Sequence, residues 1–146
     1  MGMNARTELG IRQDKVADGY FDAAAETMPR EQLAALQVKR LQTTLRNAWD
    51  HVPLHRQRLT DAGMAPQDLR SLDDVRHLPF TVKTDLRDHY PFGMFATPVN
   101  KLARLHASSG TTGKATVVGY TQADLVTWSE LMARTMKFSV PSFQCS

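Results

Sequence analysis

The sequence SSGTTGK at residues 108–114 decides how this chain is interpreted, because it stands between two segments with the character of β-strands, residues 102–107 and 116–120. Glycines let a backbone turn so that its N–H groups point at one anion, hydroxyls add donors, and a lysine adds positive charge. The pattern therefore predicts a loop that holds a polyphosphate. The residues that would hold it are Ser108, Ser109, Gly110, Thr111, Thr112, Gly113 and Lys114.

Two better-known phosphate-binding patterns do not fit this loop. A Walker A loop needs a glycine five residues before its Gly-Lys pair and a serine or threonine after the lysine, but those positions hold Ser108 and Ala115. The dinucleotide pattern G-x-G-x-x-G fails because Gly110 and Gly113 are spaced differently. The alternative is an ordinary flexible hairpin loop of small polar residues. A run of seven ending in lysine between strands favours phosphate binding.

Residues 20–91 have the pattern of helices. Pro29 suits the first turn of a helix that carries one apolar face. Pro53 is expected to end or redirect this helix, residues 54–62 to form the next one with Gly63 closing it, and residues 69–76 to form a third. We interpret the apolar face as plain core packing. Its members are Ala34, Val38, Leu41, Leu45, Ala48 and Val52, widened by Leu33, Leu36 and Trp49.

Lys83 is a second candidate for a phosphate contact. Thr81 is a suitable N-cap, with Asp85 in the first turn, which puts Lys83 near the positive end of a helix dipole. A lysine is disfavoured there unless an anion lies nearby; a solvated surface lysine is the alternative. Arg87 is expected to pair with Asp85 or Asp88 and needs no functional role.

The longer run HASSGTTGKATVVGYT, residues 106–121, resembles the phosphate-binding loop of the adenylate-forming acyl-CoA synthetase superfamily, and most closely its phenylacetate–CoA ligase branch. Residues 36–41, the turn VPLHR at 52–56 and TVKTDLRDHYPFG at 81–93 share the resemblance, which covers about residues 16–136. The family usually has a proline after the loop lysine, where this chain has Ala115. That change frees one φ angle but leaves the anion-binding groups in place.

The resemblance implies an α/β fold: an N-terminal helical unit at residues 1–91, the first strands of an ATP-binding α/β domain at 92–136, and an atypical tail at 137–146. Such ligases use Mg-ATP to convert a carboxylate into an acyl-adenylate and then pass the acyl group to CoA. The implied cofactors are therefore ATP, Mg²⁺ and CoA. Phenylacetate is the implied acid, and indole-acetate or another aryl acid remains open. The loop and Lys83 would contact the phosphates, and no catalytic residue is assigned.

Family members are much longer than 146 residues, so we expect a fragment of the N-terminal part. A helix is expected at 122–136, whereas the residues from Lys137 onward show neither family features nor a continuing helical period. We expect a truncation near Lys137; a divergent but natural C-terminus is the alternative. Such a fragment is expected to be inactive alone, poorly soluble and exposed at its strand edges.

Two function classes compete with the ligase. One is a non-catalytic module that binds a nucleotide or another anion without releasing pyrophosphate. The other is a helical interaction protein whose glycine-rich loop is incidental, in which case Lys114→Ala would change no ligand affinity.

Composition adds few constraints. The chain is 42% hydrophobic and 23% charged, with a net charge of +3. Its basic residues are scattered and interleaved with acidic ones, which argues against nucleic-acid binding. No signal peptide or apolar span is present, and the single cysteine cannot form an internal disulfide, so we expect a cytoplasmic protein that does not enter membranes. His51 and His55 flank Pro53, so no metal site is predicted. A homodimer is possible by resemblance.

Overall fold

The computed structural model describes residues 19–108 and 115–139, which form two compact units. Residues 30–121 belong to unit 2, and the segments on either side, up to Pro29 and from Gln122, belong to unit 1. The mixture of helices with one small sheet confirms the predicted α/β class. The elements are α2 (Ala23–Glu26), α3 (Arg30–His51), α4 (Pro53–Asp61), η2 (Pro66–Asp68), η3 (Leu72–His77), α5 (Lys83–Asp88), η4 (Val99–Lys101), β1 (Arg104–Ala107), β2 (Val117–Tyr120) and α6 (Gln122–Ser139).

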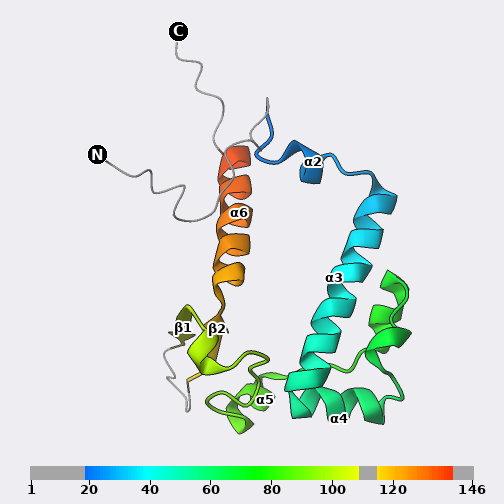
Figure 1. The fold of residues 1–146 in the computed structure, drawn as a ribbon, viewed down its shortest axis with the longest axis vertical. Helices are drawn as coiled ribbons and strands as arrows, with labels where there is room; N and C mark the ends of the chain where they lie inside the picture. The colour runs from blue at the N-terminus through cyan, green and yellow to red at the C-terminus, as the bar shows by residue number, and fades with distance from the viewer. Residues whose placement is uncertain (1–18, 109–114, 140–146) are drawn as a thin grey trace. The chain divides into compact units, whose positions relative to one another are not determined.

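Pro53 breaks the helical run of unit 2 as predicted. Helix α3 ends at His51, Val52 is extended, and α4 starts in a new direction with Pro53 at its first position (Figure 1). The Arg56 side chain fastens the corner by donating to the backbone carbonyls of Trp49 and Asp50, both at 2.8 Å. The corner directs Arg58 of α4 toward the segment that follows η3, where its Nη1 donates to the Phe80 carbonyl.

The core of unit 2 is small and lies where α3, α4 and η2 meet. Its most deeply buried side chains are Val52, Leu59 and Leu69, which are 2%, 2% and 0% exposed. Gln42 of α3 joins this core to the chain beyond η2 by donating from Nε2 to the Leu69 carbonyl at 2.7 Å. The predicted apolar face of α3 is thus only half-buried along most of its length.

The third predicted helix, residues 69–76, is wrong in form. The 3₁₀ helix η3 (Leu72–His77) takes its place, and Leu69 is extended between it and η2, which ends at Asp68. Asp74 explains the start of η3, because its Oδ2 accepts hydrogen bonds from the backbone N–H groups of Arg70 and Ser71 and from the Ser71 hydroxyl. The predicted role of Gly63 is confirmed by its φ of +67° after α4.

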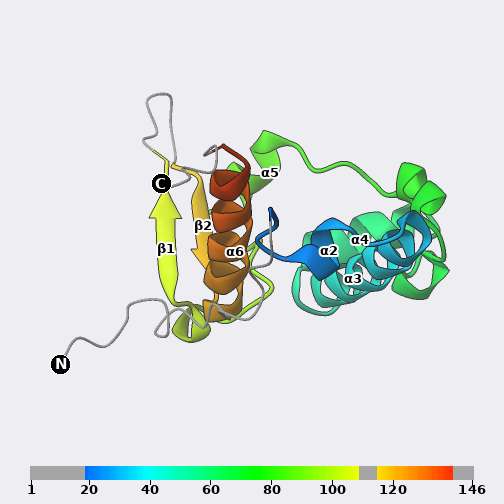
Figure 2. The same cartoon turned by 90° about the horizontal axis from the view of Figure 1, so that it is seen from above.

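The two predicted strands form an antiparallel hairpin in which Arg104 faces Tyr120 and Ala107 faces Val117 (Figure 2). The ladder begins one residue earlier, where the Ala103 N–H donates to the Tyr120 carbonyl at 2.8 Å. The rings of His106 and Tyr120 also meet, with centroids 5.0 Å apart. The hairpin thus delivers residues 109–114 as the connection between two paired strands.

Unit 1 joins α2 to α6 through charged side chains. Asp22 caps α2 by accepting from the Ala25 N–H at 3.2 Å, and Arg134 of α6 lies 3.7 Å from Asp22 and 3.4 Å from Glu26. Helix α6 runs to Ser139, past the predicted end at residue 136, so the helical period does continue into the first residues of the tail. The predicted division at residues 91 and 136 refers to the domains of larger ligases and stays a prediction.

Within the described residues, no helix combines the length and the apolar character needed to cross a membrane. No group of three or more histidine, cysteine, aspartate or glutamate side chains in these ranges could hold a metal ion.

Candidate functional site

The described part of the predicted phosphate loop is its base. Ser108 donates its backbone N–H to the Thr116 carbonyl at 3.0 Å, and the Ser108 Oγ accepts from the Thr116 N–H at 3.1 Å. The Ser108 hydroxyl thereby takes the place of a backbone carbonyl as the acceptor, and the two residues pair at the base of the loop. The Ser108 O–H remains a donor. The other predicted loop residues, Ser109, Gly110, Thr111, Thr112, Gly113 and Lys114, lie outside the described residues.

Lys83 lies exposed at the first position of α5. The predicted cap is wrong: the N-cap is Val82 rather than Thr81, and no side chain at that position caps the helix. Asp85, inside the helix, binds the N-terminal end instead, because its Oδ2 accepts the Val82 N–H at 2.8 Å. Helix α5 has only six residues, so the dipole argument for Lys83 carries little weight. What remains is a positive side chain on a helix whose start is firmly held.

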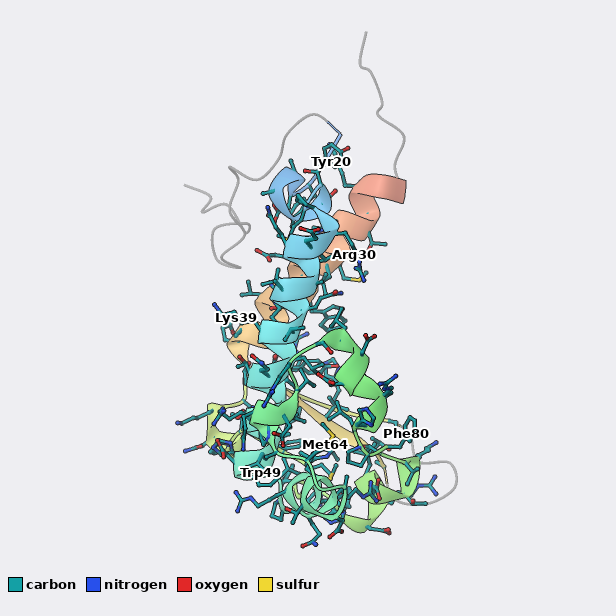
Figure 3. The ribbon with its side chains drawn as sticks, turned by 90° about the vertical axis from the view of Figure 1, so that its right-hand side faces the viewer. Tyr20, Arg30, Lys39, Trp49, Met64 and Phe80 are labelled. Carbon is teal, nitrogen blue, oxygen red and sulfur yellow. The ribbon has the colours of Figure 1, made fainter. Side chains whose placement is uncertain are left out.

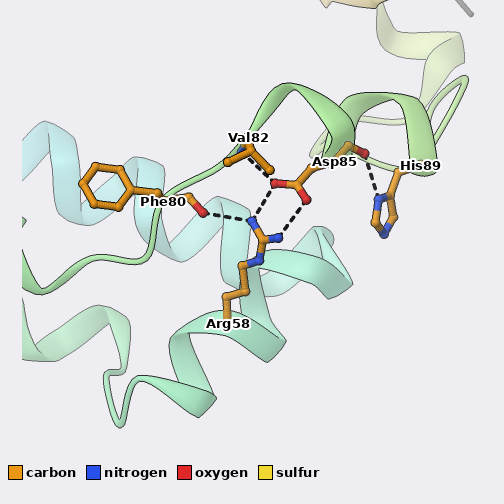
Figure 4. Close-up of polar contacts among 5 residues, drawn as sticks. All are labelled: Arg58, Phe80, Val82, Asp85 and His89. Atoms are coloured by element: carbon orange, nitrogen blue, oxygen red, sulfur yellow. Dashed lines mark hydrogen bonds and ion pairs between the residues drawn. The ribbon is translucent and has the colours of Figure 1, made fainter.

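Arg58 of α4 holds that start. Its Nη1 and Nη2 donate to the two carboxylate oxygens of Asp85 at 2.6 and 2.7 Å, and Nη1 also donates to the Phe80 carbonyl at 2.9 Å (Figure 4). Asp85 is 6% exposed and the Arg58 side chain is 29% exposed, so the carboxylate of this bidentate ion pair is shielded from water while the guanidinium is only partly covered. The predicted pairing of Arg87 with Asp85 is therefore wrong: Asp85 pairs with an arginine that lies 27 residues away.

These contacts shift the pKa values of Asp85 and Arg58, and burial is the first cause of a third shift, at His55. The Arg58 guanidinium and then the Val82 N–H hold the pKa of Asp85 below its usual range, and Asp85 in turn raises the pKa of Arg58. Burial and the nearby Arg58 charge lower the pKa of His55, although Asp85 opposes them. His55 is thus kept neutral beside a charged pair, which avoids a second cation next to Arg58.

A cavity of about 280 Å³ connects α5 with the hairpin. Leu86 of α5 lines one side, and β2 lines the other from Val117, its first residue after the loop. Phe95 and Leu102 also line it and come close to Gly119, at which a Cβ would lie 2.7 Å from Leu102 Cδ1. Helix α5 and β2, the strand that follows the predicted loop, thus line the same cavity.

Acidification is expected to destabilise unit 2 in two stages. Because the folded state lowers the pKa of His55, the unfolded chain takes up that proton first, so stability falls as the pH drops from about 6.5. Asp85, and Asp74 with its backbone and hydroxyl donors, also have lowered pKa values. Their stabilisation is complete above a pH of about 4 and is lost as the pH falls through their folded-state pKa values. Urea midpoints measured between pH 8 and pH 3 test both stages.

The control for the first stage is His55→Gln, which cannot titrate. It is expected to flatten the stability profile between pH 7 and pH 5 and to leave the loss below a pH of about 4 unchanged. A wild-type chain that gains stability on acidification from pH 7 to pH 5 would contradict the assignment.

The sequence points to the loop and Lys83, which stay predictions, and it does not reveal the contact between Arg58 and Asp85. The motif around Lys83 contains the partner, Asp85, yet nothing within α5 points to α4. The only signal in the sequence was the presence of Arg58 on the predicted second helix, between Pro53 and Gly63. Choosing the partner of Asp85 among Arg56, Arg58 and Arg87 required the direction of that helix.

Sequence comparison places these features among ligases. The chain is 54% identical over 116 residues to a phenylacetate-coenzyme A ligase of Thermus thermophilus, which covers 80% of this chain and 26% of that protein. Similar ligases of Pseudomonas putida and Escherichia coli are 53% and 50% identical over 112 residues, again 77% of this chain and 26% of each relative. The chain thus spans about a quarter of the length of these relatives. No family model matches the sequence.

The fold shows the same relationship. A structure of 2-hydroxyisobutyryl-CoA ligase in complex with 2-HIB-AMP and CoA superposes with a TM-score of 0.75 and 35% identity, covering 84% of this chain and 27% of that one. An open conformation of that ligase gives a TM-score of 0.72 at 33% identity. The predicted resemblance to this group of CoA ligases is confirmed by both comparisons.

Proposed function

We propose that this chain, the counterpart of about a quarter of a phenylacetate-CoA ligase, supplies the ATP-phosphate site of such an enzyme. The sequence similarity extends over 80% of the chain, so the loop alone does not account for it. Within it, Ser108 and Thr116 pair at the base of the glycine-rich loop, and α5, which begins with Lys83, borders the same cavity as β2. The similarity to ligases is the observation that carries the proposal.

In the proposed reaction the residues of this chain bind and orient phosphates. An oxygen of the acid attacks the α-phosphorus of ATP, which gives the acyl-adenylate and releases pyrophosphate. The CoA thiol then attacks the acyl carbonyl, so that the thioester forms and AMP leaves. The loop from Ser108 to Lys114 would donate N–H, O–H and ammonium hydrogen bonds to the β- and γ-phosphates as they separate from the α-phosphorus.

Lys83 would add a second positive charge to the same phosphates. Mg²⁺ would enter with ATP, since it binds chiefly to phosphate oxygens and water in sites of this kind. Phenylacetate is assigned as the acid because the relatives carry that name, and no described residue selects it. We further propose that the complete ligase is a cytoplasmic homodimer.

A chimaera tests the proposal. The matched segment of this chain would replace the matched 116 residues of the Thermus thermophilus ligase, and phenylacetyl-CoA formation and pyrophosphate release would be measured. The chimaera is expected to be active, and Lys114→Ala is expected to weaken MgATP use about 10–100-fold, because a charge-assisted hydrogen bond is worth about 1.5–3 kcal/mol. Lys39→Ala removes an exposed lysine of α3 and is the matched control.

The outcomes separate the function classes. A folded chimaera without thioester formation that still binds MgATP would favour the non-catalytic module. Equal activity of the Lys114→Ala and Lys39→Ala chimaeras would contradict the phosphate-loop assignment.

A further inference from the structure

We propose that Arg58 is a positioning residue that presents Lys83 to the nucleotide phosphates, an inference that rests on the proposed function. Arg58 belongs to α4 and touches neither the loop nor, in this proposal, the nucleotide. It acts through Asp85 and the backbone on either side of Lys83.

The contacts of Arg58 enclose Lys83 in the sequence. Before Lys83, the guanidinium binds the carbonyl of Phe80 at 2.9 Å; after it, the same group binds both oxygens of Asp85 at 2.6 and 2.7 Å. Asp85 closes the circle by accepting the N–H of Val82, the residue next to Lys83. A single planar side chain therefore fixes the backbone from residue 80 to residue 85 (Figure 4).

This anchoring contrasts with the segment that it holds. Helix α5 has six residues, too few for a helix to be stable on its own propensity. Phe80, which precedes it, is 89% exposed and adds no buried contact (Figure 3). The order of this segment must come largely from the buried carboxylate and its arginine. Removing Arg58 would leave Asp85 as a shielded, unpaired charge and release the start of α5.

The exposed side chain of Lys83, carried on this anchored backbone, is available to bind a ligand. Lys83 is exposed, and among the residues that the structure describes none bonds to its ammonium group. Leu86, three residues further along α5, lines the cavity that Val117 of β2 also lines. The helix that begins with Lys83 therefore borders the same cavity as the strand that follows the glycine-rich segment.

A double-mutant cycle on MgATP binding distinguishes positioning from general stability. Calorimetric titration of the chimaera described above would compare the unmodified segment of this chain with Lys83→Ala, Arg58→Ala and the double variant. We expect about a 5–10-fold loss of affinity for each single variant, in line with one hydrogen bond to a charged group. We expect no further loss when the two are combined, because Arg58 has nothing left to position.

Arg56→Ala is the matched control, since Arg56 lies on the same helix and also donates to two backbone carbonyls, those of Trp49 and Asp50. It is expected to leave MgATP affinity unchanged. Arg58→Lys is expected to behave like Arg58→Ala, because an ammonium group cannot reproduce the fork that spans Asp85 and Phe80. If Arg58→Ala unfolds the chain, Asp85→Asn, which keeps the size of the side chain, replaces it in the cycle.

The proposal is overturned if the losses for Arg58→Ala and Lys83→Ala multiply in the double variant, or if Arg58→Ala leaves the affinity unchanged while Lys83→Ala lowers it. A chain in which neither Lys83→Ala nor Lys114→Ala affects MgATP binding contradicts the proposed function itself, and the positioning role with it. These patterns differ in the behaviour of Lys114→Ala, so the two failures can be told apart.

Discussion

Leu69→Ala is expected to destabilise unit 2 by about 2–5 kcal/mol, the range for deleting a fully buried leucine side chain. Leu69 is 0% exposed and joins Val52 and Leu59 in a small core. Its backbone carbonyl is held by Gln42 of α3, which prevents the chain from moving inward to fill the space left by the side chain. The full cavity cost should therefore be felt, and it is comparable to the whole stability of a marginal unit.

Tryptophan fluorescence provides the measurement, because Trp49 lies in unit 2 and Trp128 in unit 1. In a Trp128→Phe background, the urea unfolding curve of Trp49 reports on unit 2. Leu105→Ala makes the same chemical change on β1 at a leucine that is 46% exposed, and it should cost less than about 1 kcal/mol. Equal losses at Leu69 and Leu105 would show that the core lies elsewhere.

Gly93→Ala is expected to destabilise the turn after α5 by about 1–3 kcal/mol, the cost of inserting a methyl group where none fits. A Cβ at Gly93 would lie 2.9 Å from both the Cβ and the carbonyl oxygen of His89. The Gly93 N–H also donates to that oxygen at 2.8 Å, and the His89 ring is hydrogen-bonded to the Asp85 carbonyl. The obstruction is backbone that is itself held, so neither side can yield cheaply.

Gly119→Ala is the matched control. There the Cβ would meet the ends of side chains, Leu102 Cδ1 at 2.7 Å and Phe95 Cε2 at 2.9 Å, and both residues border a cavity into which they can turn. Its cost is therefore expected to be smaller than that of Gly93→Ala. Amide hydrogen exchange at Gly93 reports on the turn after α5, and exchange at Ala103, whose N–H donates to the Tyr120 carbonyl, reports on the strand pair. A larger loss in Gly119→Ala would contradict the argument from backbone rigidity.

The parts of the fold that the sequence predicted well are those set by local chemistry. Pro53 ends a helix because it lacks an N–H, Gly63 closes one because it tolerates positive φ, and β2 begins with two β-branched valines. The errors arose where a distant side chain overrides a local preference. Thr81 is the better cap in isolation, but Asp85 already satisfies the Val82 N–H while it is gripped by Arg58.

The candidate site divides in the same way. Lys83 and the loop are visible as residue types in a pattern, and the relatives confirm the resemblance to phenylacetate-CoA ligases. The Arg58 contact was hidden because its partner lies 27 residues away, and the pairing depends on the corner between α3 and α4. The 3₁₀ geometry of η3 was hidden for a similar reason, since Asp74 draws three donors that a regular α-helix would have arranged differently.

The division of the chain into two units has a consequence for its synthesis on the ribosome. Unit 2 is one continuous segment, and its Gln42 and Arg58 contacts each join residues 27 apart, so they can form soon after those residues leave the exit tunnel. Unit 1 differs, because Asp22 and Glu26 precede unit 2 in the sequence and Arg134 follows it. The segment around α2 therefore cannot contact Arg134 until all of unit 2 has been translated.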